Sequence, residues 1–382
     1  MHILLITRHY PPEISGGARR PNLYAHALKE LGHRVTVVTP FKVEGQDSIT
    51  VKNTAILNGL KALHDKDSVS DPKGIFTRLK AHLRPWVYWP DDNIGWVNDV
   101  IRTVKRQGLQ PDWIMTTSPP ESIHLAGAKL SKLMRVPWVA ELRDTWVEQP
   151  HRQVLAESGL RAFLERRIAK KTLKTAKAIT AVSEAVIGEA RNYTNVNTPE
   201  CVISHFSDPP RSPYKFDPSN LNFVHTGGFT LSDRRRTLQP LLSILDQISL
   251  TRPNLVFHIA GPLSEDEVSQ IETSMTKVEW HGSVTLPKAR ALQAGADALI
   301  LYTPVNSHAL PGKYAEYALA GKPILYLGGG QWRELVEDPS LLRPLESAAL
   351  TIEKNETIIA KNALTHIQAA QNLVDFLKSV DV

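Results

Sequence analysis

The fold of this chain is decided by the stretch Leu310-Pro-Gly-Lys-Tyr-Ala-Glu-Tyr-Ala-Leu-Ala-Gly-Lys-Pro-Ile-Leu325, which predicts a loop, a short helix, a turn and a buried strand. Pro311 suits the first position of a helix, because the N–H group that proline lacks has no helical partner there. Gly321 and Pro323 end the helix, and Ile324–Leu327 is strand-like. Three apolar side chains of the helix are expected to face inward: Ala315, Ala318 and Leu319.

The start of this helix has the chemistry of a site for an anion and a diol. Gly312 lets the backbone approach a ligand closely. The first N–H groups of a helix favour negative charge, and Lys313 adds a positive charge beside them. Glu316, one turn further on, offers a carboxylate to hydroxyl groups. A diphosphate joined to a ribose is one ligand with that shape.

The same stretch resembles the donor-binding segment of glycosyltransferase family 4, whose two Rossmann-like domains form the GT-B fold. Similar segments follow the family's order along nearly the whole chain. They are the glycine-rich loop Tyr10–Arg20, the acceptor-side loops Thr117–His124 and Trp138–Trp146, and the turn Ala181–Glu184 before the linker. Each segment alone is a weak match, and the opening stretch also fits an ordinary packed helix before a strand. Their order and spacing together are specific.

The resemblance implies an α/β protein of GT-B architecture, in which two Rossmann-like domains have parallel sheets that face each other across a cleft. Residues 1–205 would form the N-terminal acceptor-side domain, residues 206–220 a linker, and residues 221–355 the donor-binding domain. Residues 356–382 would return to the first domain as a helix, expected over Glu356–Lys378.

The sequence pattern agrees with this architecture, because strand-like and helix-like segments alternate along the chain. The segment Ser204–Asn220, rich in Pro, Ser and Asp, separates two series of strands and reads as a linker. The expected strands are His2–Thr7, Arg34–Thr39, Asp112–Thr117, Trp138–Leu142, Ala178–Val182, Asn222–Thr226, Leu255–Ala260, Val278–Trp280, Ala298–Leu301 and Ile324–Leu327.

Composition is that of a soluble globular protein. The 382 residues suffice for two domains, and 42% of them are hydrophobic. No apolar run is long enough to span a membrane, and Ile3–Ile6 follows the first residues without a basic region or a cleavage site, which predicts no signal peptide. Because Cys201 is the only cysteine, intramolecular disulfides and cysteine zinc sites are excluded, and a reducing cytoplasm is expected.

Positive charge is concentrated in the first half of the chain. Residues 1–210 hold 29 Lys and Arg against 21 Asp and Glu, whereas the remainder holds 16 against 18. This asymmetry indicates an anionic partner for the first half, such as a phosphorylated substrate, an anionic membrane surface or nucleic acid. The basic helix Leu160–Lys177 and the basic-aromatic run Arg78–Trp89 fit a membrane surface, or simply a solvated basic face. Nucleic acid is disfavoured, because no stacking platforms or known motif accompany the charge.

Several further residues are candidates for donor binding. Gly16 and Gly17 follow the first strand, where the backbone can approach a phosphate or sugar, although a flexible turn would look the same. Gly228 closes the first strand of the second series, just before Arg235 and Arg236. Because guanidinium groups suit bidentate phosphate contacts, and the family places a basic pair near this loop, these arginines are expected to neutralise the donor diphosphate. The donor loop adds His308, Leu310, Pro311, Gly312, Lys313 and Glu316.

Two residues of the first domain are candidate catalytic groups. Asp144 follows the expected strand Trp138–Leu142, and carboxylates at the carboxyl ends of strands are well placed for chemistry. His124 lies near the start of a helix, where a structural role is the alternative. In the family, a His or Asp of these loops contacts the transferred sugar or the acceptor. One departure from the family concerns the glutamate that many members carry eight positions before the one matched by Glu316, because His308 stands there.

The resemblance implies a retaining glycosyltransferase that moves a sugar from a nucleotide-sugar donor to a sugar or lipid-linked acceptor, in cell-surface polysaccharide or glycolipid synthesis. In the family, the glutamate matched by Glu316 binds the ribose hydroxyls. No cofactor and no metal are expected. The alternatives are a nucleotide-sugar binding protein without transfer activity, which His308 favours, and a GT-B epimerase or coupling enzyme that forms no glycosidic bond. The enzyme is expected in the cytoplasm, with peripheral contact to the inner face of the membrane.

Overall fold

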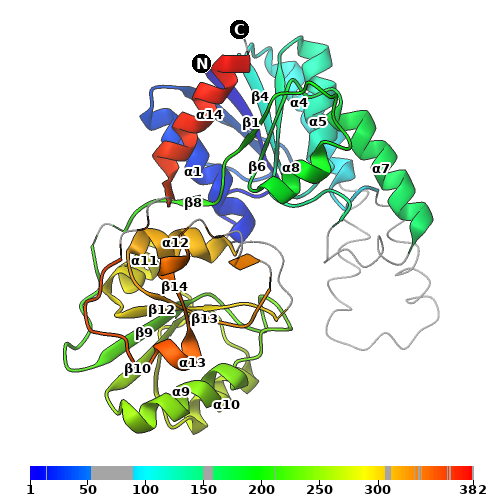
Figure 1. The fold of residues 1–382 in the computed structure, drawn as a ribbon. Helices are drawn as coiled ribbons and strands as arrows, with labels where there is room; N and C mark the ends of the chain where they lie inside the picture. The colour runs from blue at the N-terminus through cyan, green and yellow to red at the C-terminus, as the bar shows by residue number, and fades with distance from the viewer. Residues whose placement is uncertain are drawn as a thin grey trace. The chain divides into compact units, whose positions relative to one another are not determined.

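The computed structural model describes residues 1–13, 15–52, 89–148, 158–210, 212–305, 311–330, 332–333, 336, 338–358, 360 and 363–380. The chain divides into two compact units, shown in Figure 1. Unit 1 comprises Met1–Ser204 with His366–Val382, and unit 2 comprises His205–Thr365. Each unit holds a parallel sheet, of seven strands in unit 1 and six in unit 2, so the predicted α/β fold with two Rossmann-like sheets is confirmed.

The unit 1 sheet has the strand order β3-β2-β1-β4-β5-β6-β7. Leu4 and Ile6 of β1 face a core formed with helices α4, α5, α7 and α8. The alternating residues Ile3 and Leu5 point to the opposite face, where α1 packs against β2 and α14 (Figure 1). The elements are β1 (His2–Ile6), α1 (Gly16–Glu30), β2 (Arg34–Thr39), β3 (Ser48–Thr50), α4 (Ile94–Gln107), β4 (Trp113–Ser118), α5 (Ile123–Met134), β5 (Trp138–Leu142), α7 (Gly159–Leu173), β6 (Ala178–Ala181), α8 (Glu184–Ala190), β7 (Glu200–Val202) and α14 (His366–Val380).

The unit 2 sheet has the order β11-β10-β9-β12-β13-β14. Phe223 and Phe257 face a core with α9, α10 and α13, whereas Val224 and Leu299 face α11 and α12 on the other side. The elements are β8 (Phe206–Ser207), β9 (Leu221–Thr226), α9 (Gln239–Thr251), β10 (Leu255–Ala260), α10 (Glu265–Thr273), β11 (Lys277–Trp280), α11 (Leu286–Gly295), β12 (Ala298–Tyr302), α12 (Gly312–Ala320), β13 (Ile324–Leu327), the 3-10 turn η2 (Pro339–Leu341), β14 (Leu342–Pro344), α13 (Leu345–Ala348) and β15 (Leu364–Thr365).

The decisive stretch folds as its residues predict. Helix α12 runs from Gly312 to Ala320, ends at Gly321 with a φ of 68°, and is followed by strand β13. A positive φ is the left-handed conformation that glycine adopts without strain, so Gly321 can end the helix. Pro311 is the N-cap, one position earlier than expected. Ala315 and Ala318 are buried as predicted, together with Tyr317, whereas Leu319 is only half-buried.

The last helix is shorter than predicted. Helix α14 begins at His366, whereas the sequence pattern placed its start at Glu356. The chain before it cannot be helical at Ile358, because the N–H group of this residue donates to the carbonyl of Gly321 at 2.9 Å. Of the basic-aromatic run Arg78–Trp89, all but Trp89 lies outside the described residues. Within the described part of the chain, no helix is both long and apolar enough to cross a bilayer.

Candidate functional site

The carboxyl end of β9 in unit 2 forms a turn that only small residues permit. Thr226 ends the strand, and Gly227 follows with a φ of 127°, which favours glycine. The neighbouring strand end comes so close that a Cβ atom on Gly261 would lie 2.2 Å from the Gly227 carbonyl oxygen. A Cβ atom on Gly228 would lie 3.0 Å from Ser232 Oγ. Carboxyl ends of parallel strands are where such sheets bind ligands, so this turn is a candidate binding element.

Glu316 on α12 is a buried carboxylate that accepts hydrogen bonds from Lys313 and Gln293. Its side chain accepts hydrogen bonds at Oε2 from Lys313 Nζ at 3.2 Å and from Gln293 Nε2 at 3.1 Å. Only 7% of Glu316 is exposed. Gln293, on α11, also donates to Thr226 Oγ1 at 2.8 Å. The amide of Gln293 therefore links the Glu316 carboxylate to the end of β9.

Two cations converge on the same strand end. A Cβ atom on Gly227 would lie 3.6 Å from Lys313 Cε, so the lysine side chain lies over the glycine turn. The pKa of His225 is lowered to about 3, mainly by burial and also by the charges of Arg236 and Lys313. His225 therefore stays neutral at pH 7, and its Nδ1 lies 2.9 Å from the carbonyl oxygen of Ile300. This concentration of positive charge at a glycine turn is suited to an anion.

The structure distinguishes between the two predicted arginines. Both lie in a turn that precedes α9, which begins only at Gln239. Arg235 points into solvent and forms an ion pair with Asp233 at 2.8 Å, which lowers the pKa of that carboxyl to about 2. Arg236 is half-buried beside Tyr317 and Tyr302, and among the described residues no acceptor is hydrogen-bonded to its guanidinium. Arg236, and not Arg235, is therefore directed toward the end of β9.

Two residues of this arrangement were missed at the level of sequence. Gln293 is 1% exposed, and Tyr317 is fully buried with its hydroxyl 3.0 Å from the N–H group of Thr226. Gln293 occurs at the helical spacing of the buried residues Ala289, Leu292 and Ala296, so a polar residue on an inward face was the available signal. His308 and Leu310 lie outside the described residues.

In unit 1, the glycine-rich loop leads directly into α1. Ser15 is the N-cap of this helix, and its side chain accepts a hydrogen bond from the N–H group of Ala18. Gly16 is the first helical residue. A Cβ atom on Gly17 would lie 3.0 Å from the ring of His9, which is itself 3.0 Å from the Glu13 carboxylate. A side chain at position 17 would therefore crowd His9, whereas nothing lies within 4 Å of a Cβ atom on Gly16.

One guanidinium ties together three loops at the carboxyl edge of this sheet. Arg143, directly after β5, donates to the carbonyl oxygens of Ser118 at 2.6 Å, Gly17 at 2.8 Å and Pro119 at 3.3 Å. Burial lowers the pKa of Arg143. The loops after β1, β4 and β5 are therefore held in a common arrangement, and the exposed Asp144 follows directly.

A second clamp fixes the chain just beyond Asp144. The Glu189 carboxylate accepts hydrogen bonds from the N–H groups of Val147 at 2.8 Å and Glu148 at 3.1 Å, and from that of Trp146. Three backbone donors on one carboxylate define the path of the loop. Asp144 is thus held between the Arg143 contacts on one side and the Glu189 contacts on the other.

His124 lies in the core of unit 1. It is fully buried, its Nδ1 lies 2.7 Å from Thr116 Oγ1, and its ring packs beside those of Trp138 and Trp146. Burial lowers its pKa to about 3, so the imidazole is neutral at pH 7. In this position His124 presents no surface to a substrate, and the structure does not support its predicted contact with sugar or acceptor.

The comparisons with known proteins agree with this architecture. A family model described as "Glycosyl transferase 4-like domain" matches residues 15–204. No curated protein matches the chain. Among solved structures, sucrose-phosphate synthase from Thermosynechococcus elongatus superposes with a TM-score of 0.65 at 14% identity, covering 100% of this chain and 99% of that one. Anabaena HepE, solved in complex with UDP-glucose, has a TM-score of 0.62 at 16% identity, covering 99% and 100%.

An epimerase shares the same fold. A putative UDP-N-acetylglucosamine 2-epimerase from Listeria monocytogenes gives a TM-score of 0.59 at 11% identity, covering 99% of this chain and 96% of that one. At such identities the structural likenesses establish the two-domain GT-B fold. The match of the family model to the first unit, in a chain that has this fold throughout, identifies the protein as a glycosyltransferase of the glycosyl transferase 4-like family.

Proposed function

We propose that the protein is a retaining glycosyltransferase in which unit 2 binds a nucleoside diphosphate sugar and unit 1 presents the acceptor. The observation that carries this proposal is the arrangement at the end of β9, where the buried Glu316 carboxylate lies beside Lys313 and both are joined to Thr226 through Gln293. A carboxylate acceptor next to cations and a glycine turn fits a ribose next to a diphosphate. HepE, bound to UDP-glucose, supports the donor class.

The main catalytic contribution proposed is stabilisation of the leaving diphosphate. Negative charge develops on this group as the bond to the sugar breaks, and positive groups fixed beforehand stabilise it most effectively. Lys313, Arg236 and the N–H groups at the start of α12 would supply that charge, so no metal is required for the reaction. The acceptor oxygen would attack the anomeric carbon from the face that the diphosphate leaves, which retains configuration without a protein nucleophile.

Asp144 is the proposed acceptor-side carboxylate. It is exposed at the carboxyl edge of the unit 1 sheet, and the loops around it are fixed by Arg143 and Glu189. A carboxylate positioned in this way would accept a hydrogen bond from the acceptor hydroxyl and orient it for attack. His124 is assigned to the core and is not part of this proposal.

An anionic membrane surface is the proposed location of the acceptor. Helix α7 exposes Leu160 and Phe163 near its start, and one turn apart along the same face follow Arg167, Lys170 and Lys174. The Arg167 guanidinium lies 5.7 Å from the centre of the Phe163 ring. Apolar side chains beside a row of cations are suited to anionic headgroups, as a lipid-linked acceptor would require.

Incubation with UDP-, GDP- and ADP-sugars tests the function. The purified protein is supplied with each donor and with a lipid or oligosaccharide extract as acceptor, and the products are separated by chromatography. We expect one donor class to release nucleoside diphosphate in proportion to a glycosylated product whose linkage keeps the anomeric configuration of the donor. Conversion of the donor to its epimer would favour the fold's epimerase chemistry, and binding without turnover would favour a nucleotide-sugar binding protein.

A further inference from the structure

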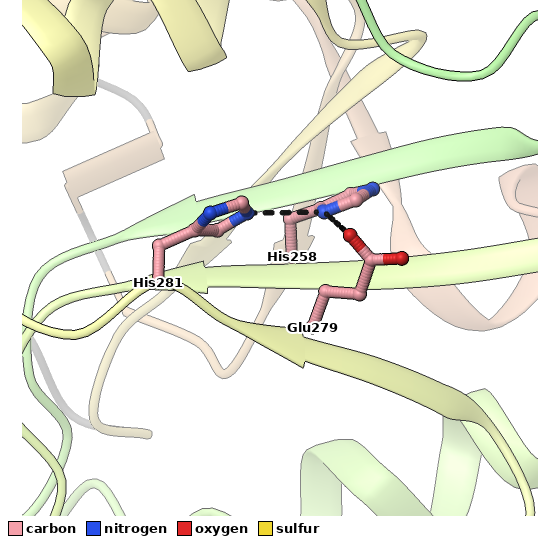
Figure 2. A group of neighbouring side chains, drawn as sticks. All are labelled: His258, Glu279 and His281. Carbon is pink, nitrogen blue, oxygen red and sulfur yellow. Dashed lines mark hydrogen bonds and ion pairs between the residues drawn. The ribbon is translucent and has the colours of Figure 1, made fainter.

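Three side chains that commonly bind metals meet at the outer edge of the unit 2 sheet. His258 lies on β10 directly opposite Glu279 on the edge strand β11, and His281 follows β11 (Figure 2). The Nδ1 atom of His258 lies 3.2 Å from His281 Nε2 and 3.4 Å from Glu279 Oε2. One ligand atom of each residue lies within 4.8 Å of the other two. None of these residues belongs to the arrangement around Glu316.

The hydrogen bond of His258 to Asn222 leaves the lone pair of Nδ1 directed toward Glu279 and His281. Its Nε2 atom lies 3.0 Å from Asn222 Oδ1, and the Nδ2 group of the same amide donates to the Asn220 carbonyl at 3.2 Å. Because that second bond fixes the amide orientation, Oδ1 is an acceptor and His258 Nε2 carries the proton. Nδ1 is then unprotonated and faces Glu279 and His281. Metal-binding histidines are typically oriented by such a partner on the opposite ring nitrogen.

The surroundings fix the positions of the ligand atoms. Only 2% of His258 is exposed, so its ring is held within the sheet. Glu279 forms an ion pair through its other oxygen, because Lys277 Nζ lies 3.0 Å from Oε1. The carboxylate therefore offers Oε2 as a single ligand atom on the His258 side.

The two distances from His258 to the other ligand atoms match those of a tetrahedral coordination shell. Zinc binds imidazole nitrogen and carboxylate oxygen at about 2.0–2.2 Å, which places neighbouring tetrahedral ligand atoms about 3.4 Å apart. The two distances from His258 Nδ1, 3.2 and 3.4 Å, agree with that value. Two histidines and one carboxylate form a ligand set that Zn²⁺ favours, whereas Mg²⁺ favours oxygen ligands alone.

We propose that His258, Glu279 and His281 form a binding site for a divalent transition-metal ion of the Zn²⁺ class, with water as the fourth ligand. The ion takes the place of the proton shared by the two imidazoles. His281 keeps one proton by moving it from Nε2 to Nδ1, so binding releases no net proton from the protein. The positive charges of Lys277 and the neighbouring Lys288 repel a metal ion. Binding therefore needs all three ligands together to offset this repulsion.

The consequence of binding is a cross-link within unit 2. Among the described strands, β11 is the edge strand of its sheet and pairs with β10 alone. An ion bound by His258 on β10, by Glu279 on β11 and by His281 just after β11 would fix the edge strand to its neighbour. The role is structural, and it does not depend on the proposed transfer reaction.

Titration of the full-length, tag-free protein with ZnCl₂ after chelator treatment tests the site. By calorimetry, we expect one Zn²⁺ ion to bind tightly to each chain. Zn²⁺ should raise the melting temperature, whereas Mg²⁺ should leave it unchanged. Co²⁺ should give the intense absorption bands of a four-coordinate site. Glu279→Gln and His281→Gln alter half-exposed residues and should each weaken Zn²⁺ binding at least tenfold, since even a supporting residue changes metal affinity 10- to 100-fold.

The matched control is His33→Gln. His33 Nδ1 lies 3.2 Å from the N-terminal amine, so this pair is another place where zinc could attach. The control should keep the tightly bound Zn²⁺ ion, and circular dichroism should show each metal-free variant to be folded. Absence of saturable Zn²⁺ binding by the unaltered protein, or equal affinity in folded His281→Gln, would overturn the proposal.

Discussion

Gln293 holds Glu316 through a hydrogen bond of 3.1 Å from helix α11 to helix α12, and both side chains are buried. The same Nε2 group reaches Thr226 at the end of β9. The Gln293 amide therefore fixes the Glu316 carboxylate next to Thr226, although Thr226 and Glu316 are far apart in sequence. The first two predictions depend on this relationship.

Gln293→Leu should weaken donor binding while keeping the side-chain volume. A hydrogen bond to a charged group contributes about 1.5–3 kcal/mol, so we expect the donor KM to rise about tenfold or more. Steady-state kinetics at varied donor concentration measure this. Gln247→Leu, on an exposed position of α9, is the control and should leave KM unchanged. An unchanged KM in Gln293→Leu would show that the orientation of Glu316 does not matter for the donor.

Glu316→Ala should lower transfer activity at least tenfold with the fold intact, because the proposed ribose contact loses its charged acceptor. Turnover and donor affinity are measured together with circular dichroism. Glu272→Ala removes an exposed carboxylate of the same unit and should behave like the unaltered protein. Full activity in a folded Glu316→Ala protein would remove the donor assignment of the whole segment.

Arg236→Gln should weaken binding of a nucleoside diphosphate about tenfold or more and leave binding of the nucleoside nearly unchanged, since only the diphosphate carries the charge that the guanidinium meets. Arg235→Gln is the matched control, because Arg235 is paired with Asp233 and exposed. Calorimetry with both ligands measures the difference. Equal losses in the two variants would mean that the cluster acts only as a general source of positive charge.

His124 should make unit 1 sensitive to acid. Its pKa of about 3 in the folded protein lies below the ordinary value of 6.5. Between these values the unfolded chain binds a proton that the folded chain does not, so stability falls as pH decreases from about 6.5 toward 3. When the pH is lowered from 8 to 5, the melting temperature of His124→Asn, measured by calorimetry, should fall less than that of the unaltered protein. Its turnover number should stay within about threefold, and a larger loss would restore a catalytic role.

Lys170→Glu with Lys174→Glu should abolish binding to anionic vesicles at low salt. Each Lys or Arg near such a surface contributes about 1 kcal/mol, and salt screens this attraction over roughly 10 Å at 0.1 M. Co-sedimentation with anionic and neutral vesicles measures it. Lys105→Glu with Arg106→Glu makes the same charge change on α4 and should retain binding. If the unaltered protein shows no preference for anionic vesicles, the membrane proposal fails and the transferase proposal is unaffected.

The parts of the site that could be predicted are those contained in one continuous segment. Lys313 and Glu316 are a turn apart on the same helix, so the segment itself brings them together. Gln293 comes from another helix, and only the packing of α11 beside α12 makes it a partner of Glu316. The sequence alone does not distinguish Arg235 from Arg236 as a phosphate ligand. They differ only in the folded turn, where Asp233 holds the Arg235 side chain in solvent.

Burial explains the remaining differences between sequence and structure. A histidine at the start of a helix after a strand has the position of many functional residues. The environment of His124 is set by Thr116, Trp138 and Trp146, which follow from the packing of α5 on the sheet and not from its own segment. The metal-binding group was equally invisible, because His258 and Glu279 become neighbours only through the register of β10 and β11.

The pairing of Phe206 with Leu364 and of Ser207 with Thr365 has a consequence for biosynthesis. Unit 2 begins and ends on these adjacent strands, so it is an insertion within unit 1, whose last helix, α14, is made only after residues 205–365 have been synthesised. The surface of α1 that α14 covers therefore stays open on the ribosome until α14 has been synthesised. A truncated chain that lacks α14 would expose this surface permanently, so unit 1 reaches its final stability only when α14 is in place.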